Sequence, residues 1–163
     1  MYYLRTMNVQ AFCDRRVAND ASLTELRIFL DNTNDSELKL ILKAAKKNKT
    51  LKRVLVRGEG WPLLVQGSYR GKSLSVLAAR SLASVVSEHP EIQEIEFYCK
   101  RFKEFGPIAL AIQQNRNLLT RLLINDCRVT PNDVKCIRWL LTENALESIT
   151  LKYHMLKAVV VWL

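Results

Sequence analysis

Apolar residues recur along this chain at one fixed set of spacings. In the clearest copy they stand at Leu119, Leu122, Ile124, Cys127 and Val129, which is the spacing L-x-x-L-x-L-x-x-N/C-x-L. The alternation around the middle positions is typical of a short β-strand with one buried face. A further copy begins 27 residues later, at Leu146. The pattern therefore predicts a structural unit that repeats.

The same pattern can be followed toward the N-terminus. Five units begin at residues 23, 51, 92, 119 and 146, with spacings of 28, 41, 27 and 27 residues. The first three units lack Asn or Cys at the turn position, which falls on Lys100 in the third unit. Parallel strands in this register would stack Leu26, Val54, Ile95, Leu122 and Ile149 in one core column and Ile28, Val56, Phe97, Ile124 and Leu151 in the next.

Helices are expected between these strands. Small or apolar residues stand nine and ten positions before each later unit, as a buried helix face requires. Thr130, Pro131 and Asp133 predict an N-cap, a first-turn proline and a first-turn acid, and Asp35 and Ser36 play the same part for the first helix. The predicted helices span about 35–48, 74–89, 103–116 and 131–144.

These strand-helix units resemble the leucine-rich-repeat family, and their length resembles the ribonuclease-inhibitor type. The resemblance covers Leu23 to Leu156. It implies an α/β fold: a leucine-rich-repeat solenoid in the form of a right-handed horseshoe segment, with parallel strands on the concave side and helices on the convex side. It also implies a scaffold that binds a protein partner and has no enzymatic activity.

Three segments depart from the repeat. Residues 1–22 are interpreted as an N-terminal half-repeat or cap. The insertion at about 58–73 holds four of the five glycines, and its apolar part, Trp61 to Val65, either packs on the solenoid or forms a binding loop. The run from Val159 to Leu163 lacks a capping helix, so we expect a truncated chain, a natural fragment or an end that pairs with another molecule.

The net charge of +9 is concentrated in one place. Residues 38–58 contain eight basic residues and no acidic one. Helical spacing puts most of the lysines on the outer side of the first helix, where a solvated surface is the plainest interpretation. The alternative function is a basic-surface binder of nucleic acid or anionic membrane. The basic patch consists of Lys39, Lys43, Lys46, Lys47 and Lys49.

The sequence offers only weak matches to catalytic, nucleotide-binding and metal-binding motifs. Gly67 to Ser73 reads G-x-x-x-G-K-S, one residue short of a phosphate-binding loop, and a glycine-rich connector is the better interpretation. His89 can cap a helix end and His154 can occupy a turn, with no nucleophile placed near either. The four cysteines show no metal-ligand spacing. We therefore expect no catalytic residue, no metal site and no cofactor.

The first residues lack the layout of a secretory signal, and the longest apolar run is far shorter than a membrane span. With reduced thiols as the default, these features favour the cytoplasm, or a host cytoplasm if the protein is a secreted effector.

The repeat register also fixes which strand side chains point outward. One outward column, Glu25, Arg53, Glu94 and Arg121, alternates in charge and is expected to pair within the sheet. Another column places Phe29 and Tyr98 on either side of Arg57, and aromatic and Arg side chains dominate interface energetics. The predicted partner-binding residues on the concave face are Phe29, Arg57, Tyr98, Asn125, Lys152, Arg27 and Glu96.

Overall fold

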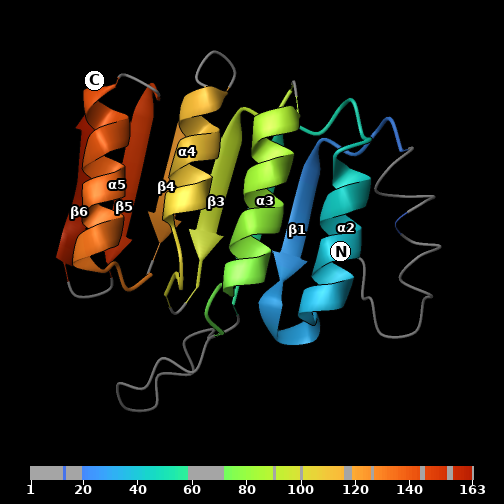
Figure 1. Ribbon diagram of the computed structural model, residues 1–163. Helices are drawn as coiled ribbons and strands as arrows, with labels where there is room; N and C mark the ends of the chain where they lie inside the picture. Colours follow the sequence, from blue (N-terminus) through green and yellow to red (C-terminus); the bar gives the residue numbers. More distant parts are fainter. Residues whose placement is uncertain are drawn as a thin grey trace.

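The computed structural model describes a sheet covered by helices (Figure 1). The described residues are Cys13 and residues 20–58, 72–89, 91–99, 101–115, 119–125, 127–143, 146–153 and 156–162, with side chains described as far as residue 151. Most of the predicted half-repeat at 1–22 and most of the insertion at 58–73 therefore lie outside the described residues, and so do Lys100 and His154.

The sheet has six strands in the order β1-β2-β3-β4-β5-β6. The first five run parallel, in the register predicted from the repeats: Leu26, Val54, Ile95, Leu122 and Ile149 are successive partners, and so are Ile28, Val56, Phe97, Ile124 and Leu151. The two predicted columns are confirmed. The strands are β1 (Glu25–Phe29), β2 (Arg53–Arg57), β3 (Glu94–Tyr98), β4 (Arg121–Asn125), β5 (Ser148–Tyr153) and β6 (Leu156–Trp162).

Four α-helices lie on one face of this sheet, which we call the helix face (Figure 1). They start and end within three residues of the predicted bounds. A 3-10 turn, Leu30–Asn32, precedes α2 (Asp35–Ala45). The helices are α2 (Asp35–Ala45), α3 (Val76–Glu88), α4 (Gly106–Gln114) and α5 (Pro131–Thr142).

The helix starts follow from local hydrogen bonds. At α5 the predicted cap is confirmed, because the Thr130 side chain accepts from the Asp133 amide while the Asp133 carboxylate accepts from the Thr130 amide. At α2 the cap is Asn34, one residue earlier than predicted, and Glu37 completes the reciprocal pair. A sequence that offers Asn34, Asp35 and Ser36 in succession holds three candidate caps, and only the one with Glu three residues on makes both bonds.

The core lies between the sheet and the helices. The inward strand side chains and the apolar helix residues form one buried cluster there, which includes Leu122, Ile108 and Ile137. A cluster of three phenylalanines fills the space beside β3 and α4: the Phe97 and Phe102 ring centroids are 5.0 Å apart, and those of Phe102 and Phe105 are 4.9 Å apart. The apolar columns of the repeats thus form one continuous core.

Cys99, directly after β3, contacts the turn residue Cys127 of the next unit. Its Sγ lies 3.3 Å from the Sγ of Cys127, and its amide donates to that Sγ. The 27-residue register continues beyond the turn, where Arg101 pairs with Arg128. None of the four cysteines, Cys13, Cys99, Cys127 and Cys136, forms a disulfide.

His89 also differs from expectation. Its ring is fully buried and reaches across to the previous repeat, where Nε2 contacts the carbonyl oxygen of Asn48. A carbonyl can only accept, so Nε2 carries the proton, and Nδ1 accepts from the Glu91 amide. His89 therefore joins neighbouring repeats and does not bind the last carbonyls of its own helix.

The C-terminal run does not leave the end of the sheet bare. It forms β6, which pairs with β5 in the antiparallel direction. Only two residues separate Tyr153 from Leu156, and a connection this short can join antiparallel strands but not parallel ones. The repeat thus ends in a hairpin, which the 27-residue period did not predict.

The two ends of the insertion meet. Gly58 donates its amide to the carbonyl oxygen of Tyr98, and a Cβ placed on Gly58 would lie 2.5 Å from the carbonyl oxygen of Lys72. The chain leaves the sheet at Gly58 and returns beside it at Lys72. Glycine is required at position 58 because only a residue without a side chain allows this approach of two backbones.

Candidate protein-binding face

The face of the sheet opposite the helices, here called the strand face, carries the outward column of alternating charge. Arg53 is its centre: its guanidinium is 2.9 Å from a Glu25 carboxylate oxygen and 2.7 Å from one of Glu94, and it also contacts Glu96. Arg121 lies 3.4 Å from Glu94. The expected pairing within the sheet is confirmed, so these charges are largely neutralised before any partner arrives.

The ionisation of this network follows from its geometry. Burial raises the pKa of Glu25, but the hydrogen bonds and charges of Arg27 and Arg53 outweigh burial, and the net pKa is below its usual value. Burial likewise lowers the pKa of Arg53, and the three carboxylates around it more than reverse that shift. Glu25 and Arg53 therefore stay ionised at neutral pH.

The side chains in the middle of the strand face are buried. Leu55 is only 2% exposed although it alternates with the core residues Val54 and Val56 and so lies on the opposite side of the sheet. Glu96 and Asn125, predicted as partner contacts, are 7% and 2% exposed, and Asn125 donates to the Glu96 carboxylate at 2.8 Å. These two side chains hold the network together in this conformation and leave little surface for a partner.

Other predicted contacts lie at the margins. Arg27 is exposed and contacts Glu25. Lys152 pairs with Asn125 in the backbone register, and its side chain lies outside the described residues.

Phe29, Arg57 and Tyr98 form a row at the carboxyl ends of β1, β2 and β3. They are direct register partners on neighbouring strands, and all three side chains are half-buried. The Arg57 guanidinium carbon lies 5.3 Å from the centroid of the Tyr98 ring, a cation–π distance. We call these three residues the aromatic–arginine row. It is the part of the strand face where aromatic and cationic surface is both accessible and held in place.

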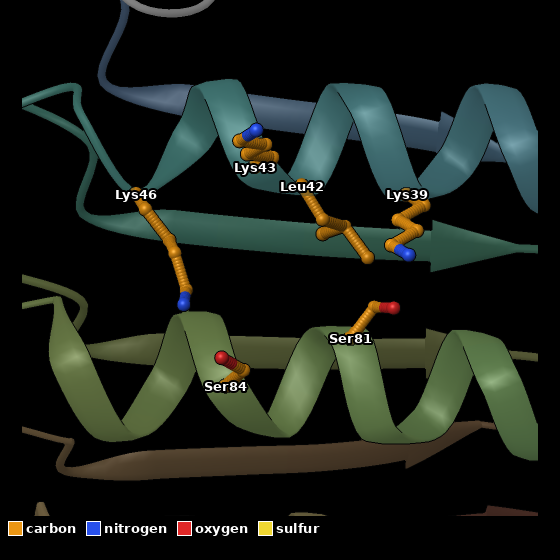
Figure 2. Close-up of a pocket in the computed structure, with 6 residues that line it drawn as sticks. All are labelled: Lys39, Leu42, Lys43, Lys46, Ser81 and Ser84. Atoms are coloured by element: carbon orange, nitrogen blue, oxygen red, sulfur yellow. The ribbon is translucent and has the colours of Figure 1, made fainter.

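The basic patch lies on the helix face. Lys39, Lys43 and Lys46 of α2 line a pocket of about 310 Å³ with Leu42 of the same helix and with Ser81 and Ser84 of α3 (Figure 2). Lys47 and Lys49 are exposed and do not line it. The structure thus divides the predicted basic patch into a groove with three lysines and two lysines outside it.

Within the described part of the chain, no three His, Cys, Asp or Glu side chains come together as metal ligands would. Over the same residues, no helix combines the length and the apolar character needed to span a membrane.

No family model matches the sequence, and no curated protein matches it. Its fold is shared by solved structures, among them the following two. One is described as leiomodin-1 actin-binding site 2, at 22% identity and a TM-score of 0.66, covering 92% of this chain and 82% of that chain. The other is a tropomodulin C-terminal domain from Caenorhabditis elegans, at 14% identity and a TM-score of 0.62, covering 93% and 85%. The chain therefore has a leucine-rich-repeat-like α/β fold with a parallel sheet.

Proposed function

We propose that this chain is a non-catalytic scaffold that binds a protein partner through the strand face, with the aromatic–arginine row as the anchor. In this proposal the chain consists of five repeats of the ribonuclease-inhibitor type, beginning at residues 23, 51, 92, 119 and 146. The strands line the concave side of a solenoid and the helices cover its convex side. The repeats then serve to place side chains of neighbouring strands in fixed columns.

The observation that carries the proposal is the contrast within the strand face. Its central charges are paired with one another and its central side chains are buried, whereas Phe29, Arg57 and Tyr98 remain half-accessible at one edge. Aromatic and Arg side chains are enriched among the residues that contribute most to binding. Because Arg57 already lies against Tyr98, little conformational freedom remains to be lost when a partner binds.

Actin is the partner to test first, because the leiomodin-1 structure that shares this fold is described as an actin-binding site. At 22% identity the binding residues cannot be carried over, so the test rests on this chain's own side chains.

The test is the dissociation constant for actin of the wild type and of Tyr98→Ala. Truncating Tyr98 should weaken binding by about 30-fold, or roughly 2 kcal/mol, while the thermal midpoint of unfolding changes little. Trp139→Ala is the matched control, because Trp139 is a partly exposed aromatic residue on α5, on the helix face. Equal losses in both variants would argue against the aromatic–arginine row.

The basic patch supports a second candidate, binding of nucleic acid or anionic membrane. The supporting observation is that Lys39, Lys43, Lys47 and Lys49 are all exposed on and just after one helix. Affinity of this kind falls steeply with salt, whereas affinity based on an aromatic anchor does not. A salt titration of binding therefore separates the two candidates.

A further inference from the structure

The groove between α2 and α3 has two ends with similar donors and different occupants. Lys46 and Ser84 lie at one end and Lys39 and Ser81 at the other, with Lys43 and Leu42 between them along the helix (Figure 2). Lys39 and Lys46 are two helical turns apart on α2, and Ser81 and Ser84 are about one turn apart on α3. Each end therefore offers at least one ammonium group and one hydroxyl group.

The Lys46 end already holds a carboxylate. Lys46 Nζ is 2.7 Å from a carboxylate oxygen of Glu88, and the Ser84 hydroxyl donates to the same oxygen at 2.9 Å. Hydrogen bonds from Lys46 and Ser84 hold the pKa of Glu88 below its usual value. A lysine on α2 and a serine on α3 thus bind a carboxylate in this groove, and Glu88 shows the geometry.

The Lys39 end has the same kinds of donor without such a carboxylate. Lys39 and Ser81 face each other across the groove, and Lys43 lies one turn along the helix, between Lys39 and Lys46 (Figure 2). Within the described residues, neither Lys39 nor Lys43 forms an ion pair, whereas Lys46 does. The groove is therefore half neutralised.

We propose that the Lys39 end of this groove binds a carboxylate of an acidic segment in a partner protein, in the way that the Lys46 end binds Glu88. A recess of about 310 Å³ between two helices fits a side chain and a short stretch of peptide. A flat bilayer would contact the exposed lysines outside it equally well. Proteins that bind single-stranded nucleic acid combine a positively charged groove with aromatic side chains on which the bases stack, and no aromatic residue among those described lines this groove.

The experiment measures binding of a fluorescein-labelled decaglutamate peptide by fluorescence anisotropy at several salt concentrations. The double variant Lys39→Glu/Lys43→Glu should weaken binding by about tenfold or more, because it replaces two charge-assisted donors by acceptors. The matched control is Lys47→Glu/Lys49→Glu, which changes the net charge equally outside the groove. This control should weaken binding by about threefold or less. Equal losses would overturn the proposal in favour of a diffuse charge effect.

Two milder substitutions, one neutral and one that removes a single charge, test the groove without reversing the charge of its lysines. Ser81→Ala removes a hydroxyl and should weaken peptide binding by about threefold at unchanged net charge. Glu88→Gln removes the internal carboxylate and should strengthen binding by about threefold, because the Lys46 end can then accept a second carboxylate. Glu143→Gln, an equal charge change at the end of α5, should have little effect. A gain of binding cannot result from misfolding, so a Glu88→Gln variant that binds no better than Glu143→Gln overturns the proposal.

The same variants distinguish the other ligand classes. Binding of phosphatidylserine vesicles or of a labelled 20-nucleotide single strand should be reduced equally by the groove pair and by the control pair. If either ligand binds more tightly than decaglutamate and depends on Lys39 and Lys43 alone, the groove is a site for that ligand and the proposal is wrong. These measurements do not involve Tyr98, so their outcome is independent of the strand-face proposal.

Discussion

Arg53 is the residue whose removal tests the strand-face network most sharply. It is the shared partner of Glu25, Glu94 and Glu96. Replacing it by Met keeps an unbranched apolar stem of similar volume and removes the positive charge. Three carboxylates on neighbouring strands then face one another without their central cation.

The expected loss in the free energy of unfolding depends on which partners each carboxylate retains after Arg53 is replaced. Glu25 keeps Arg27 and Glu94 keeps Arg121, but Glu96 keeps only the hydrogen bond from Asn125. Removing one partner of a fully buried pair costs about 3 to 5 kcal/mol, and exposed pairs contribute about 1 kcal/mol or less. Because the Arg53 side chain is 37% exposed, solvent screening reduces the first value. We expect Arg53→Met to lower the free energy of unfolding by about 2 kcal/mol at pH 7.

Urea unfolding of the wild type, Arg53→Met and Arg121→Met at pH 7 and pH 4 provides the assay. Arg121 is mostly exposed and contacts only Glu94, so its loss should cost about 0.5 kcal/mol. At pH 4 the stranded carboxylates can take up protons, so the cost of Arg53→Met should fall below about 1 kcal/mol. A second change, Glu96→Gln, should recover about 1 kcal/mol in the Arg53→Met background at pH 7. A cost that is equal at both pH values, or that Glu96→Gln does not reduce, would refute the reasoning.

Three further predictions concern the fold. Burial lowers the pKa of His89 despite its hydrogen bond to Asn48 and the charge of Glu91, so the unfolded chain takes up a proton first, and stability should fall as pH drops through about 6.5. Urea unfolding between pH 7.5 and 5.5 should show this slope in the wild type, and a smaller one in His89→Gln. Gly58→Ala should lower the free energy of unfolding by about 1 to 3 kcal/mol, because its Cβ would clash with the backbone of Lys72, whereas Gly106→Ala, with open space around it, should be neutral or stabilising. Leu122→Ala should cost about 2 to 5 kcal/mol in thermal or urea unfolding, since the side chain is fully buried in the core.

The parallel part of the sheet could be predicted because its information is local and periodic. A strand side-chain period of two and a repeat of 27 to 28 residues together fix which residues become neighbours, and the register of β1 to β5 followed. The pairing of Arg53 with the glutamates of adjacent strands followed from that register. Such columns form whenever each repeat stacks on the next repeat in the same register.

What the sequence did not reveal depends on distances across the fold. The contact of Cys99 with Cys127 joins positions 28 residues apart, so the 27-residue spacing did not reveal it. The burial of Leu55, Glu96 and Asn125 could not be read from alternation, because alternation assigns a face and not an exposure. The donors from α3, Ser81 and Ser84, were missed because no local pattern links them to lysines some 40 residues earlier.

Hydroxyl-radical footprinting of aromatic side chains, with and without saturating actin, tests the central claim most directly. The method reports the accessibility of individual side chains on both faces of one molecule in a single experiment. The account predicts that oxidation of Phe29 and Tyr98 falls when the partner binds, while Trp139 on the helix face stays as reactive as before. Protection of Trp139 with unchanged reactivity at Phe29 and Tyr98 would contradict it.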